Sequence, residues 1–197
     1  MTTIGVLAVQ GDVREHRAML EQVGTDTVDV RYVDELDGID GLVIPGGEST
    51  AIINLLKRQE LVEPLRAQIA EGLPVYGSCA GMILLSDKVE GREDQELLGG
   101  MDIAVKRNAF GRQVASFEAP VYCQTIGDEP FHGIFIRAPW AEVIGDGVEV
   151  LGTVTDHEGQ TRAVALRQGS LFVTAFHPEL TDDTRMHEYF VREIVQS

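Results

Sequence analysis

One short stretch of this chain combines a reactive side chain with a backbone that could expose it. Cys79 stands in the sequence Gly77-Ser78-Cys79-Ala80-Gly81, with a glycine two residues before it and another two residues after it. This spacing is typical of a nucleophile elbow, a sharp turn between a strand and a helix that leaves little room for a Cβ. A thiol at the first turn of a helix is favoured as thiolate by the helix dipole. The alternative is a buried cysteine that packs as a small hydrophobic residue.

A cysteine nucleophile needs a base to hold its proton and a further group to orient that base. His177 follows a strongly apolar run, residues 171–176, and Glu179 stands two residues further on, after Pro178. Pro178 restricts the backbone between them, so that Glu179 could reach back to the imidazole. We therefore expect Cys79, His177 and Glu179 to be the catalytic residues of an acyl transfer through a thioester. The other interpretation makes His177 a loop residue and places Glu179 near the start of the last helix.

We assign no chemistry to the other histidines or to the second cysteine. His16 lies in a predicted helix among charged neighbours and is expected at the surface, His132 and His157 lie in turn-rich stretches, and His187 lies in the last helix. Cys123 lies in an alternating strand without flanking glycines, so we expect it to pack in the core. Neither cysteine has a partner at the spacing of a zinc site, and we expect no metal.

A second glycine-rich turn could stabilise the charge that develops during acyl transfer. Pro45-Gly46-Gly47 follows an apolar run, residues 41–44, and offers backbone N–H groups with no bulky side chain in the way. Together with the N–H of Ala80, Gly46 and Gly47 could form an oxyanion hole. The stretch is not a Walker loop, because the Gly-Lys-Ser/Thr ending is absent. The simpler interpretation is an ordinary turn between a strand and a helix.

The elements that must position these residues follow an α/β pattern. Continuous apolar runs are typical of strands buried on both faces of a parallel sheet. Such runs, or shorter apolar stretches, predict strands at residues 4–9, 27–30, 41–44, 73–77 and 171–176. Helices are predicted at residues 13–23, 49–58, 64–71 and 183–195, the first capped by Asp12 and the last by Thr181 or Asp182. Short strands are predicted at residues 101–106, 114–119, 121–123, 134–136, 148–154 and 162–166.

This order predicts a doubly wound, mostly parallel central sheet flanked by helices, with a small antiparallel β extension. In such sheets the site lies beyond the carboxyl ends of the strands. The loops at Gln10-Gly11, at residues 45–49 and at residues 78–81 should therefore share one rim.

Composition limits the partners. The chain has 197 residues and a formal net charge of −16, which argues against nucleic acid and anionic membranes. Two cysteines make no disulfide framework, and no segment has the length of a membrane span. We therefore expect a soluble, cytoplasmic protein.

With the elbow and His177-Pro178-Glu179 in place, the chain resembles the triad-type (class I) glutamine amidotransferases. Further stretches resemble the family of glutaminase subunits of pyridoxal 5′-phosphate synthase (PdxT/SNO family): Val9-Gln10-Gly11, Pro45-Gly46-Gly47-Glu48-Ser49-Thr50, Arg107-Asn108-Ala109-Phe110-Gly111-Arg112-Gln113 and Phe135-Ile136-Arg137-Ala138-Pro139. The resemblance extends over essentially the whole chain and implies one glutamine amidotransferase domain, residues 1–197. One departure is Ser78, where many relatives carry Thr or another residue.

The resemblance implies that Cys79 attacks the side-chain amide of L-glutamine and that ammonia passes to a partner synthase subunit, with no cofactor. It also implies further roles for residues of the matched stretches: Gly47, Glu48 and Ser49 line the glutamine site, Arg107 and the Ile136-Arg137 pair hold the amino-acid end, and Gln10 lies beside the oxyanion loop. An arginine suits the α-carboxylate, although either arginine could instead be an ordinary ion-pair partner.

Three other functions remain open from the sequence. A class I glutaminase could serve another ammonia acceptor, such as imidazole glycerol phosphate synthesis. The chain could be a catalytically silent binding or scaffold subunit, or an elbow-cysteine hydrolase or chaperone with the same sheet. The last group has no need for the distant His177-Pro178-Glu179 stretch.

Overall fold

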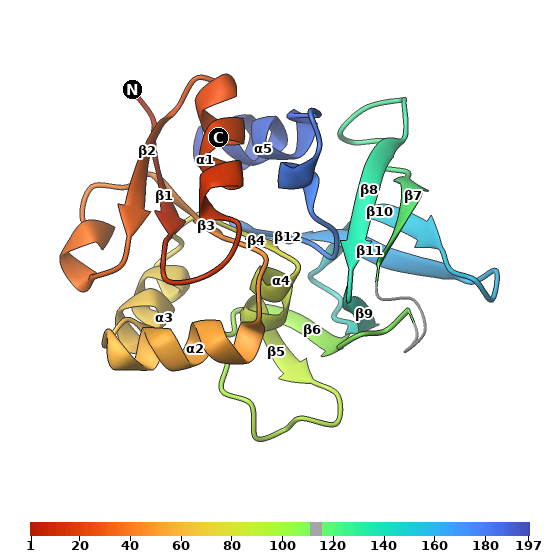
Figure 1. The fold of residues 1–197 in the computed structure, drawn as a ribbon, viewed down its shortest axis with the longest axis horizontal. Helices are drawn as coiled ribbons and strands as arrows, with labels where there is room; N and C mark the ends of the chain where they lie inside the picture. Colours follow the sequence, from red (N-terminus) through yellow and green to blue (C-terminus); the bar gives the residue numbers. More distant parts are fainter. Residues whose placement is uncertain (111–115) are drawn as a thin grey trace.

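A seven-stranded sheet runs through the centre of the molecule in the order β10-β11-β12-β4-β3-β1-β2 (Figure 1). The computed structural model describes residues 1–110 and 116–197. The strands of this sheet are β1 (Thr3–Leu7), β2 (Asp26–Val30), β3 (Gly41–Ile44), β4 (Val75–Ser78), β10 (Glu149–Thr155), β11 (Thr161–Gln168) and β12 (Leu171–Thr174). The five strands from β12 to β2 are parallel, and β11 and β10 extend the sheet in antiparallel fashion beside β12. The predicted fold class is confirmed.

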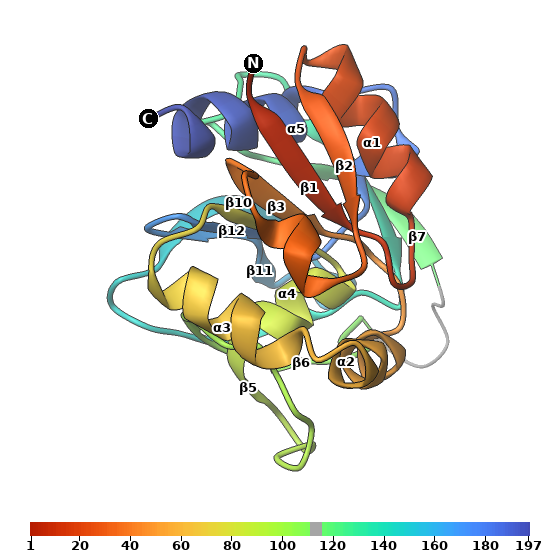
Figure 2. The same cartoon turned by 90° about the vertical axis from the view of Figure 1, so that its left-hand side faces the viewer.

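Helices cover both faces of this sheet (Figures 1 and 2). They are α1 (Val13–Gln22), α2 (Ser49–Arg58), α3 (Val62–Ala70), α4 (Ala80–Leu85) and α5 (Arg185–Phe190). α1 and α5 lie on one face, whereas α2, α3 and α4 lie on the other. The two termini meet at one end, where Gln196 Nε2 donates to Thr2 Oγ1 at 2.9 Å. No helix within the described residues is long and apolar enough to cross a membrane.

Two small sheets lie beside the central one. β5 (Ser86–Val89), β6 (Met101–Lys106) and β9 (Trp140–Ile144) form the first, and β7 (Ser116–Val121) and β8 (Phe131–Ile136) form an antiparallel pair. β5 and β9 were not predicted, because each is short and only partly buried. The strand predicted at residues 121–123 is instead the end of β7 followed by an isolated bridge from Tyr122 to Thr153. Of the strand predicted at residues 114–119, positions 114 and 115 lie outside the described residues.

The predicted cap of the last helix is wrong, and the predicted cap of the first helix is right only in its position. The last helix begins at Arg185 after Thr184, and it continues from Phe190 as the π-helical turn η3 (Val191–Val195). Thr181 Oγ1 accepts instead from Asp183 N, within the loop that precedes the helix. Asp12 is the N-cap residue of α1, but its side chain makes no capping hydrogen bond. Its carboxylate is therefore free to act elsewhere.

The parallel strands bring the candidate residues to one edge. β3, β4 and β12 are direct neighbours, with Ile44 paired to Gly77 and Thr174 paired to Ser78. All four residues of each of these three strands are buried, as their apolar sequences predict. The segments that follow the strands carry the glycine-rich turn, Cys79 and His177. The predicted convergence of strand ends therefore has a simple cause in the strand order.

Candidate active site

Cys79 occupies a strained turn between β4 and α4. Its φ of +47° lies in the left-handed region, which a residue with a side chain seldom adopts unless the surroundings impose it. A Cβ on Gly77 would lie 2.6 Å from the carbonyl carbon of Gly81, and one on Gly81 would lie 2.5 Å from the oxygen of Ile44. Both glycines are needed because backbone passes against backbone. The structure thus contains the predicted elbow, and the Cys79 amide fastens it to β12 by donating to Thr174 O at 2.7 Å.

His177 and Glu179 form a buried pair at the end of β12. Nδ1 of His177 lies 2.8 Å from Oε1 of Glu179, and the Glu179 side chain has no exposed surface. The short 3-10 helix η2 (Pro178–Leu180) turns the chain back, so that Glu179 reaches the ring. The His177 amide donates to Ile134 O in β8 at 2.9 Å, which fixes the segment against a second sheet. Because Glu179 takes Nδ1, the Nε2 atom of His177 is available to another group.

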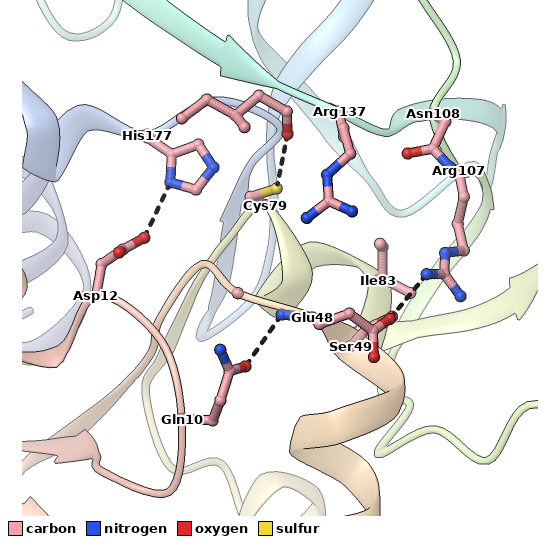
Figure 3. A pocket seen from close by; sticks show the side chains of 12 residues that line it. Gln10, Asp12, Glu48, Ser49, Cys79, Ile83, Arg107, Asn108, Arg137 and His177 are labelled. Carbon is pink, nitrogen blue, oxygen red and sulfur yellow. Dashed lines mark hydrogen bonds and ion pairs between the residues drawn. The ribbon is translucent and has the colours of Figure 1, made fainter. Parts of the chain in front are cut away.

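Asp12 is a second carboxylate beside His177, and the sequence analysis gave it only a capping role. Its Oδ2 lies 3.4 Å from Nδ1 of His177, and Figure 3 shows the carboxylate directed at the ring. Burial alone would lower the pKa of His177, but hydrogen bonding with Asp12, Cys79 and Glu179 raises it to about 12. The site therefore favours an imidazolium, the form that stabilises a neighbouring thiolate.

The expectation that His16 lies at the surface is wrong. His16 is completely buried, with Nε2 3.0 Å from Ser78 Oγ and 3.4 Å from Glu179 Oε2. Its Nδ1 lies 2.9 Å from Nε2 of His187, which is also completely buried. Burial would raise the pKa of Glu179, but the His16 and His177 rings hold it well below its usual range. A sequence signal existed, because His16 precedes the buried Met19 by three residues and so shares its face of the helix.

A cavity of about 300 Å³ opens over Cys79. It is lined by Gln10, Asp12, Gly47, Glu48, Ser49, Cys79, Ile83, Arg107, Asn108, Ile136, Arg137 and His177. The three predicted rim loops and the β8 end therefore surround one space (Figure 3). The volume suits a small molecule with the size of an amino acid. Asn108 and Ile83 were not predicted as lining residues.

Glu48 and Arg107 hold each other at one side of this cavity. The Glu48 carboxylate caps α2 by accepting from Thr50 N at 3.2 Å and Ala51 N at 2.7 Å, and it accepts from Arg107 Nη2 at 3.0 Å. Burial would raise the pKa of Glu48, but those N–H groups and Arg107 lower it overall. Arg107 also donates to Gln95 Oε1 at 3.0 Å. The Arg107 guanidinium is thus engaged within the protein.

Arg137 differs from Arg107 in that its guanidinium has no partner within residues 1–110 and 116–197. Arg137 has a φ of +46°, and its side chain reaches into the cavity between Cys79 and Glu48 (Figure 3). Among the described residues it forms no ion pair and no side-chain hydrogen bond. The neighbouring Ile136 carbonyl lies 3.8 Å from Sγ of Cys79. An unpaired guanidinium beside a thiol makes this end of the cavity suitable for a carboxylate.

The glycine-rich turn lies directly against His177 and Gln10. A Cβ on Gly46 would collide with the His177 ring, and one on Gly47 would lie 2.5 Å from Oε1 of Gln10. That oxygen already accepts from the Glu48 amide at 3.0 Å. Ala80 follows Cys79 as the first residue of α4. Gly46 therefore lies against the base, Ala80 follows the thiol directly, and Gly47 lines the same cavity next to Gln10.

Ser49 and Cys123 are the two other residues for which the sequence predicted a place. Ser49 is buried, and its Oγ accepts from Gln95 Nε2 at 3.2 Å. Cys123 is buried against Gly152, and burial raises the pKa of its thiol to about 12, so the predicted packing role is confirmed. Residues 111–113 of the motif that begins at Arg107 lie outside the described residues.

Asp12, His177 and Glu179 each bring one ligand-type atom within 4.8 Å of the others. The 2.8 Å contact between Nδ1 and Oε1 is a direct hydrogen bond, so both atoms already have a partner. We therefore interpret the cluster as a base with two carboxylates rather than as metal ligands.

Comparison with known proteins agrees with this geometry. The model of the SNO glutamine amidotransferase family matches residues 6–196. "Pyridoxal 5'-phosphate synthase subunit PdxT" of Salinispora tropica is 59% identical over 188 residues, which cover 95% of this chain and 94% of that protein. The protein of the same name from Kineococcus radiotolerans is 60% identical over 192 residues, or 96% and 93% of the two chains. A crystal structure of a glutamine amidotransferase superposes with a TM-score of 0.90 at 42% identity, covering 98% of this chain and 99% of the other.

Proposed function

Because this chain belongs to the SNO glutamine amidotransferase family, we propose that it is the glutaminase subunit of a pyridoxal 5′-phosphate synthase. It hydrolyses L-glutamine to L-glutamate and ammonia, and the ammonia passes to a synthase subunit. One observation carries the proposal: a strained cysteine, a histidine held by a buried glutamate, and an arginine without a side-chain partner among the described residues line a single cavity of about 300 Å³. The family match at residues 6–196 also supports one glutamine amidotransferase domain over residues 1–197.

The chemistry follows from the contacts of Cys79 and His177. The Sγ proton passes to Nε2 of His177, and Sγ forms a bond to the amide carbon of glutamine. The imidazolium then protonates the nitrogen as the C–N bond breaks, which releases ammonia and leaves a glutamyl thioester. Water adds to the thioester as His177 takes its proton. The C–S bond then breaks, and His177 returns that proton to Sγ, which gives glutamate and the thiol. Glu179 keeps Nδ1 protonated and oriented throughout.

We assign the oxyanion hole to the N–H groups of the Gly46-Gly47 turn and of Ala80, which border the thiol. Their backbone donors would stabilise the tetrahedral intermediate without a reorganisation cost. Gln10 tethers this loop through the Glu48 amide, so a partner that displaces Gln10 could reorder it. We accordingly expect glutamine hydrolysis to be slow until the synthase binds.

Substrate binding divides between two arginines. Arg137 holds the α-carboxylate of glutamine, together with the backbone of Ile136. Arg107 acts through Glu48, because its guanidinium is occupied by the Glu48 carboxylate and Gln95. Gly47, Glu48 and Ser49 form the opposite wall of the glutamine site.

The test is glutamate release from glutamine, measured with and without the candidate synthase subunit. We expect strong stimulation by the synthase, loss of all release in Cys79→Ser, and near wild-type release in Cys123→Ser, whose thiol is buried away from the cavity. Equal loss in both variants would contradict the assignment of the nucleophile. Equal rates with and without the synthase would refute the gating. A glutaminase that copurified with, and was stimulated by, an imidazole glycerol phosphate synthase subunit would support that acceptor instead.

A further inference from the structure

Behind the triad lies a buried chain of polar side chains that glutamine cannot touch. It runs from His187 in α5 through His16 in α1 to Ser78 at the end of β4 and to Glu179. All four residues are at most 5% exposed. Buried polar groups are costly unless they are hydrogen-bonded. Four such groups in contact, drawn from four separate elements, require an explanation beyond packing.

The two oxygens of Glu179 have unequal partners. Oε1 accepts from His177 at 2.8 Å. Oε2 is fully buried and, among the described residues, meets no group within full hydrogen-bond geometry. Nε2 of His16 lies 3.4 Å from it. The stabilisation of this carboxylate oxygen therefore depends on whether Nε2 of His16 carries a proton.

The tautomer of His16 follows from its other neighbours. Nδ1 of His187 has no partner within the described residues, and a buried N–H without an acceptor costs more than a bare ring nitrogen. The His187 proton therefore belongs on Nε2, from which it is donated to Nδ1 of His16. His16 then carries its own proton on Nε2, which it donates to Ser78 Oγ at 3.0 Å and which lies beside Glu179 Oε2, 3.4 Å from the nitrogen. The opposite assignment would leave an orphaned N–H and would turn a lone pair towards a carboxylate.

We propose that His16 is a positioning residue of the glutaminase site: His16 holds Oε2 of Glu179 and thereby fixes His177. His187 sets the tautomer of His16. The inference rests on the proposed glutaminase function. It extends the Cys79–His177–Glu179 arrangement by two residues that do not touch the substrate. Ser78, the residue before the nucleophile, accepts a hydrogen bond from the same Nε2–H and so connects the buried chain to the elbow.

The proposal predicts which substitutions are tolerated at position 16. A Gln side chain can place its amide nitrogen where Nε2 stands, whereas an Asn side chain reaches only as far as Nδ1. His16→Gln should therefore retain most activity, while His16→Asn and His16→Leu lose it. The loss should appear in kcat, by about tenfold, because the contact between the His16 N–H dipole and a buried carboxylate is lost. KM for glutamine should change little, because the cavity walls are untouched.

The acid limb of the kcat profile provides a second readout. Among the described residues, the ionisable groups around Glu179 and His177 are Asp12, Glu15 and His16 from α1 and the residue before it, Tyr76 from β4, Cys79 from the elbow, and His187 from α5. Without the His16 proton, the Glu179 carboxylate is easier to protonate, so the acid limb should move to higher pH in His16→Leu. A purely structural role would lower the melting temperature without moving this limb.

The experiment measures glutamate release by the complete complex with the synthase, across pH, for wild type, the three His16 variants and His187→Leu. His157→Leu is the matched control, because His157 is exposed on a turn far along the chain, and it should behave as wild type. We expect His187→Leu to reproduce part of the His16→Leu effect on kcat. Wild-type kcat in folded His16→Leu, or equal activity of the Gln and Asn variants, would overturn the proposal. Absence of glutamate release in the wild type would instead refute the glutaminase function itself.

Discussion

Replacing Gly46 by alanine tests how closely the glycine-rich turn is fitted to the catalytic base. A Cβ at this position would lie 2.7 Å from Nδ1 of His177, closer still to Cε1, and 3.2 Å from Asp12 Oδ2. Real Cβ contacts stay above 3.0 Å, so the ring or the loop must shift by roughly half an ångström in a packed interior. A 1 Å misplacement of a catalytic group can lower a rate about 100-fold. We therefore expect kcat of Gly46→Ala to fall by about 10- to 100-fold.

The assay is steady-state glutamate release in the presence of the synthase, with Gly147→Ala as the matched control. A Cβ on Gly147 would meet only Gln168 Nε2, at 3.9 Å, so this variant should keep wild-type kcat. Gly46→Ala keeps the backbone amide at position 46, so a second assay is needed to show which part of the site it disturbs. Alkylation of Cys79 by iodoacetamide requires the thiolate but forms no oxyanion, and it therefore reports an effect on the base alone. We expect slower alkylation at neutral pH. A kcat within about twofold of wild type, in a folded variant, would refute the fit of this turn to His177.

Two further predictions concern charge. Arg137→Ala should raise KM for glutamine about tenfold or more, as expected for lost charge-assisted hydrogen bonds, and Arg137→Lys should recover only part because it lacks the planar fork; unchanged KM in both would exclude Arg137 from the α-carboxylate. Glu179 has a lowered pKa, so its contribution to stability is complete above its ordinary pKa of 4.5 and is lost as pH falls further. His177 has a pKa raised to about 12, so its contribution is complete below 6.5 and is lost as pH rises towards 12. Thermal unfolding across pH should show both losses, and Glu179→Gln should remove the acid-side loss; an unchanged acid side would contradict the role of Glu179.

The sequence predicted those features that depend on one element at a time. The strands β1, β3, β4 and β12 are apolar on both faces, so their runs were visible, and parallel order then placed their ends at one edge. The elbow was visible because backbone contact at Gly77 and Gly81 excludes any side chain. His177 and Glu179 are close in sequence, and a short helical turn sufficed to join them.

The features that were missed depend on contacts between distant elements. His16 was assigned to the surface because its sequence neighbours are charged, yet the partner that buries it, His187, lies 171 residues away. Asp12 matched a helix cap, which local sequence favours, while its contact with His177 arises only when α1 packs beside η2. Gln95 lies in a loop without a motif, and only Arg107 and Ser49 give it a place in the site.

The two carboxylates at His177 cannot contribute equally. Glu179 is fully buried and makes the shorter contact, whereas the Asp12 side chain is 36% exposed at 3.4 Å, where solvent screens its charge. Glu179 therefore fixes the ring, and Asp12 adds a weaker attraction that can change when the cavity fills. Asp12 and His16 stand one helical turn apart at the start of α1, two and six residues after Gln10. The segment at the start of α1 thus contacts three parts of the site. Asp12 contacts His177, His16 contacts Glu179, and Gln10 contacts the oxyanion loop. A partner that binds this segment would reach all three parts of the site at once, which makes the α1 start the physical route by which a synthase could control hydrolysis.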